Sequence, residues 1–231
     1  MKKIIFTLLA LAATVSMNAQ IMRIMKGNTV VATFSAAQAD NVVFEEETAA
    51  PIAGTAKRTG DIDVAWVQLW AGGPRFAEYN VGATSVTDYG GYYAWGGSQD
   101  KVDDHNTGSE SLSGDSDTAT KLWGNNWRMP TQAELKALLD IDNCTIEWTN
   151  INGVNGIKFT GKGNYASNSI FIPAAGFVDQ GMVGGLGNRG YIWASSLSDT
   201  NLVYSLGFRS NNWFVDYNDR DLCLSVRAVL K

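Results

Sequence analysis

Short apolar runs, separated by glycine and asparagine, set the strongest limit on how this chain can fold. The chain has 24 Gly against four Pro, a balance typical of many tight turns. In the second half of the chain no run is longer than a strand. The runs span Cys144 to Thr149, Gly156 to Thr160, Ser169 to Pro173, Gly190 to Ala194, Val203 to Phe208, Trp213 to Tyr217 and Cys223 to Leu230. We therefore expect many short strands.

One helix stands out. Thr131 and Glu134 have the spacing of a capping box, and Leu135, Leu138 and Leu139 follow it as an apolar stripe on one face. Earlier strands are expected over residues 64–69 and 76–83. Residues 101–120 are polar and predict a long surface loop. One helix among many short strands indicates an α+β domain.

The first sixty residues divide into three segments. Lys2 and Lys3, an apolar core from Ile4 to Val15 and the small-residue site ending at Ala19 are typical of a secretory signal, so residues 1–19 are predicted to be a signal peptide. Residues 20–46 contain strand-like runs at 21–25, 29–34 and 42–44 and predict a small β unit. Residues 47–59 have the composition of a linker. The main domain is predicted at 60–231.

The composition and charge of the chain exclude some classes of function. Hydrophobic residues make up 45% of the chain and charged residues 18%, which is enough for a core. The formal net charge is −5, so an exported protein of this kind is a poor candidate for binding nucleic acid. The apolar core of the signal is too short to span a bilayer, and no transmembrane segment is expected. We expect export to the periplasm, the cell surface or the medium.

Two cysteines, Cys144 and Cys223, leave two alternatives open. An even count in an exported chain allows one disulfide, and two buried thiols are the other possibility.

Catalytic and metal sites have little support. His105 is the single histidine, and beside it Asp103 and Asp104 offer fewer converging ligands than a metal site needs. The chain has no evident nucleophile–histidine pairing. No catalytic residue, metal or cofactor is predicted.

The carboxyl-terminal stretch combines apolar anchors with side chains suited to recognition. Tyr provides rigid contact area, and Asn or Ser provides adaptable hydrogen bonding. The predicted ligand-binding residues are Tyr204, Arg209, Asn211, Asn212, Trp213, Asp216, Tyr217, Asn218, Asp219, Arg220 and Asp221. Trp213 and Tyr217 are expected to act as stacking anchors. Alternation along this strand should turn about half of these residues outward. A polar strand and turn without a binding role is the alternative.

Several segments of residues 60–231 carry a family resemblance. They are N-V-G-A at 80–83, D-Y-G-G-Y-Y-A-W-G at 88–96, W-R-M-P-T at 127–131, I-F-I-P-A-A-G at 170–176, Y-I-W-A-S-S at 191–196 and S-V-R at 225–227. In this order the chain resembles the Fibrobacter-type major paralogous domain of secreted bacterial proteins. That family is related to the C-type-lectin fold and to formylglycine-generating enzymes. The resemblance implies an irregular α+β domain whose late strands and loops present a ligand face, with an unknown protein or glycan as partner.

The resemblance has limits. Formylglycine-generating enzymes use two cysteines near the carboxyl end, where this chain has only Cys223, so that activity is not implied and no enzyme is expected. The E-P-N or Q-P-D and W-N-D triplets of calcium-dependent lectins do not occur.

The tail also resembles the variable segment of diversity-generating retroelement proteins. Asn codons rewritten at their adenines cannot yield Lys, Gln, Glu, Met or Trp. Residues 183–230 contain no Lys, Gln, Glu or Met, although these types occupy 29 of the 231 positions. Strands and turns disfavour Lys, Glu and Gln in any case, which is the competing explanation. We expect an exported ligand-binding protein with a hypervariable surface; the alternative is a non-diversified structural or adhesin module of the cell envelope.

Overall fold

The computed structural model describes residues 21–26, 29–35, 52–98 and 104–231. The chain divides into two units, Met1–Ala50 and Pro51–Lys231. In the first unit, β1 (Ile21–Lys26) pairs antiparallel with β2 (Thr29–Ser35), with a bulge between Ile24 and Met25. This hairpin confirms two of the three strands predicted for the small β unit. The third run, at 42–44, and the predicted signal peptide lie outside the described residues.

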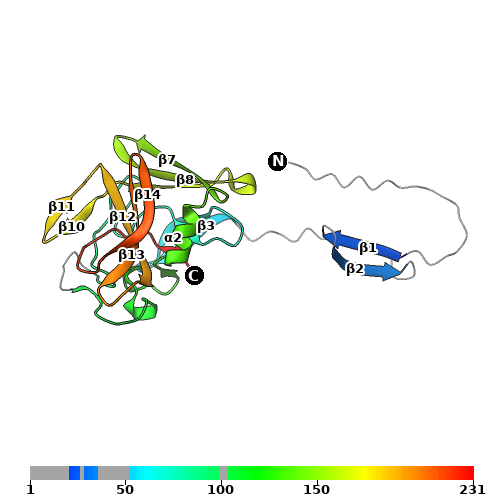
Figure 1. Cartoon of the computed structure of the whole chain (residues 1–231), viewed down its shortest axis with the longest axis horizontal. Coiled ribbons are helices and arrows are strands. Elements are labelled where there is room, and N and C mark those ends of the chain that lie inside the picture. Colours follow the sequence, from blue (N-terminus) through cyan, green and yellow to red (C-terminus); the bar gives the residue numbers. More distant parts are fainter. Residues whose placement is uncertain (1–20, 27–28, 36–51, 99–103) are drawn as a thin grey trace, which may run out of the picture. The chain divides into compact units, whose positions relative to one another are not determined.

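The second unit carries the remaining elements (Figure 1). In chain order they are β3 (Ala53–Arg58), β4 (Ile62–Gln68), β5 (Arg75–Ala77), η3 (Gly114–Ser116), α1 (Thr118–Trp123), β6 (Trp127–Arg128), α2 (Gln132–Leu138), β7 (Cys144–Ile151), β8 (Val154–Gly161), η4 (Gly163–Tyr165), β9 (Ser169–Pro173), β10 (Phe177–Asp179), β11 (Met182–Gly184), β12 (Arg189–Leu197), β13 (Leu202–Arg209), β14 (Asn212–Asp219) and β15 (Val229–Leu230). About 44% of the described residues lie in strands and about 11% in helices, so the described part of the chain is mostly β with few helices.

Two sequence predictions need correction. The linker predicted at 47–59 contains β3, which pairs with β4 from Ala53↔Val67 to Arg58↔Ile62, so the boundary at residue 60 is too late. Small and exposed side chains dominate β3, and its apolar pattern is therefore weak. The surface loop predicted at 101–120 ends in α1, whose Thr118 and Thr120 are buried. Asp117 caps this short helix by accepting from the Thr120 amide at 2.9 Å.

The chain's end closes the largest sheet. Its strand order is β3-β4-β5-β15-β6, so β15 lies between two strands from the first half of the unit. Val229 stands opposite both Phe76 and Arg128. Smaller sheets have the orders β7-β8-β9, β12-β13-β14 and β10-β11. This arrangement fixes the carboxyl-terminal segment at both ends, through β12–β14 and through β15.

Two core clusters lie on either side of the β12–β14 sheet. Trp193 and Val203 belong to a tryptophan-rich cluster that includes Trp95 and Trp127. Ile192, Ala194, Leu206 and Phe208 belong to an aliphatic cluster that includes Leu135 and Phe159. Neighbouring residues of β12 therefore point into different clusters, as strand alternation requires. Because both faces of this sheet are packed over part of their length, the sheet is a firm support for exposed side chains.

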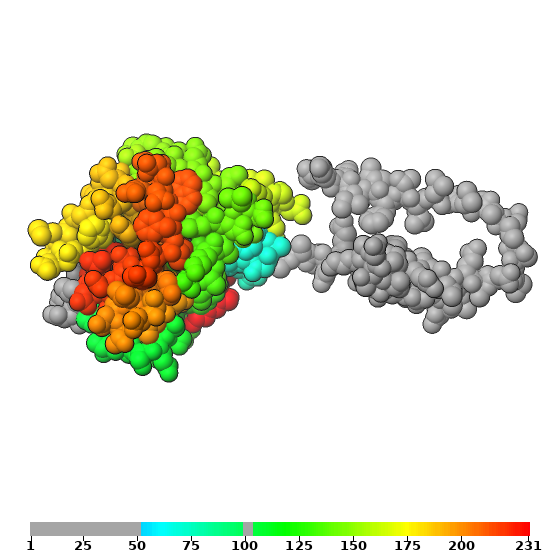
Figure 2. Space-filling view, viewed as in Figure 1, coloured from blue at the N-terminus to red at the C-terminus, as the bar shows by residue number. Residues whose placement is uncertain are grey.

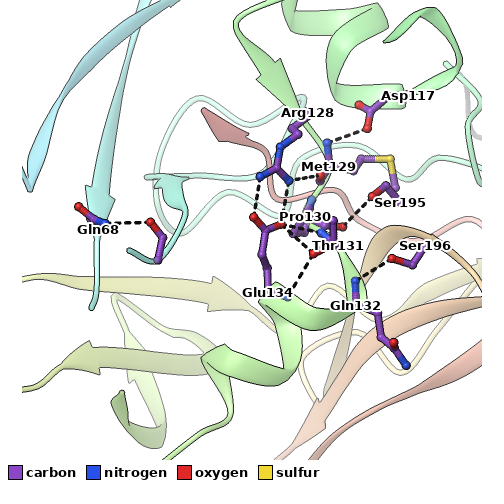
Figure 3. A network of polar contacts seen from close by, with 11 residues as sticks. Gln68, Asp117, Arg128, Met129, Pro130, Thr131, Gln132, Glu134, Ser195 and Ser196 are labelled. Carbon is purple, nitrogen blue, oxygen red and sulfur yellow. Dashed lines mark hydrogen bonds and ion pairs between the residues drawn. The ribbon is translucent and has the colours of Figure 1, made fainter. Parts of the chain in front are cut away.

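A polar network joins α2 to β12 (Figure 3). The capping box predicted at Thr131 is confirmed, with Glu134 accepting from the Thr131 amide at 2.7 Å. Arg128 donates to both carboxylate oxygens of Glu134, at 2.7 and 2.5 Å. The Ser195 amide donates to the Pro130 carbonyl oxygen at 2.7 Å, which ties β12 to the residues before α2. The start of α2 is thereby fixed against the β12–β14 sheet.

No disulfide joins Cys144 and Cys223. Cys144 and Cys223 are buried and lie in different core clusters, so of the two alternatives the disulfide is wrong. Burial raises the pKa of the Cys144 thiol to about 11. Among the described residues, no helix is long and apolar enough to cross a membrane.

Candidate ligand-binding face

Most of the predicted ligand-binding residues lie on and just after β14, the last strand of the β12–β14 sheet; Tyr204 and Arg209 lie on β13, and Asn211 lies in the turn between the two strands. In Figure 2 β14 (orange-red) crosses the visible surface between the yellow β10–β11 segment and green α2. Among the described strands, β14 pairs only with β13, in register from Arg209↔Asn212 to Leu202↔Asp219, and is therefore an edge strand. Side chains therefore leave this strand on two faces, which differ in what covers them.

One face of the sheet packs toward α2 and the aliphatic cluster. Trp213 is only partly exposed and stands opposite Phe208, and Val215 stands opposite Leu206. Tyr204 packs against the same cluster, with the Lys136 ammonium of α2 at 6.0 Å from its ring centroid. Trp213 and Tyr204, both predicted ligand contacts, are thus partly exposed and also pack against the aliphatic cluster. Tyr217, further along this face, is 53% exposed.

The opposite face of the sheet, here called the outer face, is defined by Arg189, Tyr191, Arg209, Asn212, Phe214 and Asp216. Strand register arranges these residues in rows. Arg189, Arg209 and Asn212 form the first row, and Tyr191, Gly207 and Phe214 form the second. Asp216, opposite buried Ser205, stands in the third. Trp193 and Val203 bury the rest of this side of the sheet.

Arg220 is not a surface residue. It is 3% exposed, and its guanidinium donates to the carbonyl oxygens of Asn106 at 2.6 Å, Gly108 at 3.1 Å and Thr200. The guanidinium also lies 5.3 Å from the Trp95 ring centroid. Arg220 fastens two loops to the core, so its prediction as a ligand contact is wrong.

Asn218 is half-buried. Its side-chain amide donates to Ser205 Oγ at 2.6 Å, which links β14 to β13. The other predicted residues are exposed, namely Arg209, Asn211, Asn212, Asp216, Tyr217, Asp219 and Asp221. Asp221 also lies 3.4 Å from His105 Nδ1. Seven of the eleven predicted residues therefore lie at the surface, at the end of β13, in the turn that follows it, along β14 and just after β14.

Sequence reasoning missed part of this surface. Phe214 is 36% exposed and lies between the predicted residues Trp213 and Asp216, yet it was treated as an ordinary strand position. Arg189 lies outside the predicted set and is twenty residues before Arg209 in the sequence. Only the β12–β13 register reveals that Arg189 and Arg209 are direct neighbours. Alternation around Asp216 could have identified Phe214; no signal in the sequence identifies Arg189.

A small pocket opens at the first two rows. It has a volume of about 130 Å³ and is lined by Arg189, Tyr191, Phe208, Arg209 and Phe214. Gly207 is essential to its shape, because a β-carbon there would lie 2.8 Å from two ring carbons of Phe214 and 3.1 Å from the Tyr191 ring. The Phe214 and Tyr191 rings therefore lie together over the backbone of Gly207, which has no side chain to separate them.

Other parts of the described chain offer less chemistry. A more open pocket of about 440 Å³ includes Arg75, Arg128, Glu134 and Lys231, but the Arg128 and Glu134 side chains are committed to each other. Burial raises the pKa of the Asp117 carboxyl, although amides of Thr120 and Met129 donate to it and work in the opposite direction. That carboxylate holds α1 and β6 in place. Within the described residues, no three His, Cys, Asp or Glu side chains gather as a metal site would require.

Comparisons of the chain with protein-family models, with curated proteins and with solved structures each find no match.

Proposed function

We propose that this protein is an exported receptor that binds its ligand through β14 and the outer face of the β12–β14 sheet. The observation that carries the proposal is a row of exposed polar and aromatic side chains along an edge strand with buried anchors. Asp216, Tyr217 and Asp219 are exposed, whereas Leu206, Phe208 and Trp193, which belong to the same sheet, are at most 2% exposed. Exposed recognition side chains on a packed support lose little conformational entropy on binding.

The chain that follows β14 is held in place by buried side chains, which favours a binding role over a loose tail. Arg220 is bonded to three backbone carbonyl oxygens just after β14. Arg227 is fully buried and donates to Asn80 Oδ1 and to the carbonyl oxygens of Ala77, Glu78 and Phe171 at 2.7 to 3.0 Å. Two buried arginines and β15 therefore hold the segment after β14 in place. None of them uses the surface side chains of β14, which are free to vary.

The fold proposed for residues 51–231 is the C-type-lectin-like fold of the major paralogous domain family. The motif W-R-M-P-T with Glu134 supports it, since its residues form the network that seats α2. A ligand face on late strands is what that resemblance implies.

We also propose that β14 is diversified by a retroelement. Between Phe214 and Leu224 the exposed positions are Phe214, Asp216, Tyr217, Asp219 and Asp221, whereas Arg220, Cys223 and Leu224 are buried. A diversified receptor would vary the first set and keep the second. The DNA beside the gene tests this: a reverse transcriptase and a near-copy of these codons, with adenines at the exposed positions, are expected. Adenines concentrated at the buried positions, or no near-copy at all, would reject diversification.

Binding itself is tested with arrays. Labelled full chain is applied to a glycan array and a peptide array, beside the triple variant D216A/Y217A/D219A. The control T145A/E147A changes two exposed positions of β7, a strand of another sheet. The expected result is at least one bound array feature that the triple variant loses and the control keeps. Equal binding by all three proteins, or no binding by any of them, would contradict the proposal.

A further inference from the structure

The outer face carries two unneutralised cations at one end. Arg189 and Arg209 stand directly opposite each other on β12 and β13, so their side chains leave the sheet on the same side. Both are exposed. Neither guanidinium has a hydrogen bond or an ion pair within the part of the chain that the structure describes. Like charges directly opposite each other destabilise a sheet. An anion bound between them would remove this repulsion.

The stem of Arg189 is held in position. A β-carbon on Gly185 would lie 2.6 to 2.9 Å from Cγ, Cδ and Nε of Arg189, so the stem runs across the backbone of that glycine. Gly185 has a φ of +72°, a conformation that few other residues adopt. The turn before β12 thus supports one of the two cations, which reduces the ordering that binding would require.

Aromatic surface adjoins the cations. Tyr191 and Phe214 meet over Gly207 in the next row, and Phe177 packs edge-on against Tyr191 with ring centroids 5.9 Å apart. Successive residues on one face of a strand are about 7 Å apart. A ligand that places a carboxylate between the two arginines therefore places its adjoining ring or chain over Phe214 and Tyr191.

The far end of the face has the opposite charge. Asp216 is exposed in the third row, about 14 Å along the strand from the arginine row by the same spacing. A carboxylate accepts hydrogen bonds from hydroxyl groups and repels a second carboxylate. Asn212, beside Arg209 in the first row, both donates and accepts. The face therefore suits a ligand with an anionic group at one end and hydroxyl groups at the other.

We propose that this pocket binds an acidic sugar residue, of the uronic acid kind, within a longer glycan. The carboxylate bonds to Arg189 and Arg209, the C–H face of the sugar ring stacks on Phe214 and Tyr191, and hydroxyls of the neighbouring sugar reach Asp216. A volume of about 130 Å³ fits one ring, since pockets for drug-sized ligands occupy roughly 300–1,000 Å³. This assignment rests on the proposed function and names its ligand class.

An acidic peptide fits less well. Guanidinium groups would accept its carboxylates too. A run of acidic side chains, however, would bring a second negative charge toward Asp216, where a sugar brings a hydroxyl donor. The negative charge of Asp216 in the third row therefore favours an acidic sugar over an acidic peptide.

The test is calorimetric titration of the full chain with three probes: trigalacturonate, its methyl ester and triglutamate. The ester keeps every sugar ring and removes the charges. The protein variants are R209M, R189M and the control K158M, which removes one positive charge from β8 in another sheet. We expect trigalacturonate to bind, with the ester and triglutamate each at least about tenfold weaker. R209M and R189M should each weaken trigalacturonate binding at least about tenfold, a loss of about 1.4 kcal/mol, and K158M less than about twofold.

Three results would overturn the assignment: no binding of trigalacturonate, equal binding of its ester, or unchanged binding by R209M and R189M. Triglutamate binding as tightly as trigalacturonate would also reject a sugar site, because charge alone would then explain recognition. These failures differ from failure of the proposed function. An array ligand that is lost in D216A/Y217A/D219A but kept in R209M leaves the receptor in place and removes only the acidic-sugar assignment.

Discussion

Replacing Arg220 and Arg209 by methionine tests the division of β14 and its surroundings into support and surface. Both substitutions remove one positive charge and shorten the side chain to the same extent. The two positions are eleven residues apart. Arg220 is 3% exposed and donates to the carbonyl oxygens of Asn106, Gly108 and Thr200. Arg209 is exposed, and its guanidinium makes no hydrogen bond or ion pair within the described residues.

The expected magnitudes follow from these contacts. A hydrogen bond to a charged group contributes about 1.5–3 kcal/mol net. Three such bonds are lost in R220M, but their acceptors lie in loops where water can replace part of each bond. We therefore expect R220M to lower the free energy of unfolding by about 3–4 kcal/mol. R209M should change it by no more than about 0.5 kcal/mol, as for most surface substitutions.

Urea unfolding followed by tryptophan fluorescence measures both values, because Trp95 lies under the Arg220 guanidinium. The denaturant midpoint should fall in R220M with an unchanged slope, which would report lost stability without a change in compactness. A loss below about 1 kcal/mol in R220M would refute the reasoning, since it would mean that the buried bonds contribute no more than surface ones. A comparable loss in R209M would refute it equally.

Three further predictions concern other positions. G207A should displace Phe214, costing about 1–3 kcal/mol in urea unfolding and weakening trigalacturonate binding; an unchanged midpoint would contradict the contact over Gly207. Burial works to raise the pKa of Glu134, but bonds from Arg128 and Thr131 outweigh it and hold that pKa below its ordinary value. Stability from a lowered pKa is present above the unfolded pKa, near 4.3, and is lost as pH falls through the folded value. E134Q should thus be about 1–3 kcal/mol less stable at pH 6, with the difference narrowing toward pH 3; a constant difference would contradict this. Burial and a pKa of about 11 should protect Cys144 from iodoacetamide at pH 8 until the chain unfolds, as mass spectrometry of its peptide would show; rapid native labelling would be the contrary result.

Strands with continuous apolar character could be predicted from the sequence. The run at 169–173 matches β9 at both ends, because four of its five residues are buried and β-branched or aromatic types dominate it. The capping box at Thr131 placed the start of α2 for the same local reason. The residues within each of these elements determine its structure, so the sequence of the element alone is enough to predict it.

Elements that depend on tertiary contacts could not be predicted this way. β3 has small and exposed side chains and exists because β4 pairs with it along six residues. α1 is six residues long, too short for a helical period to appear. Arg220 is buried because carbonyl groups about twenty and about one hundred residues away converge on it. No window of sequence around Arg220 contains that information.

The candidate site likewise combines features that can be predicted from the sequence with features that depend on tertiary contacts. Alternation along β14 indicates that neighbouring residues face opposite ways, but it does not say which face α2 covers. Contact with the aliphatic cluster assigns Trp213 and Val215 to the covered side and leaves Phe214 and Asp216 outside. The arginine pair depends in addition on the register between β12 and β13. The side-chain composition of the carboxyl-terminal stretch thus predicts where the candidate surface lies. The pairing of the strands determines which side chains lie together on it.

Buried supporting residues and exposed surface residues lie within a few positions of each other in this chain. Strand β14 is an edge strand, so exchanging its outward side chains disturbs one neighbour instead of two. Immediately after it, Arg220 is committed to the core, and Arg227 follows with four acceptors. A mechanism that rewrites codons without regard to burial would destroy these anchors as often as it altered the surface. Hypervariability of β14 is therefore compatible with a stable fold only if the rewritten codons follow the strand's exposed positions.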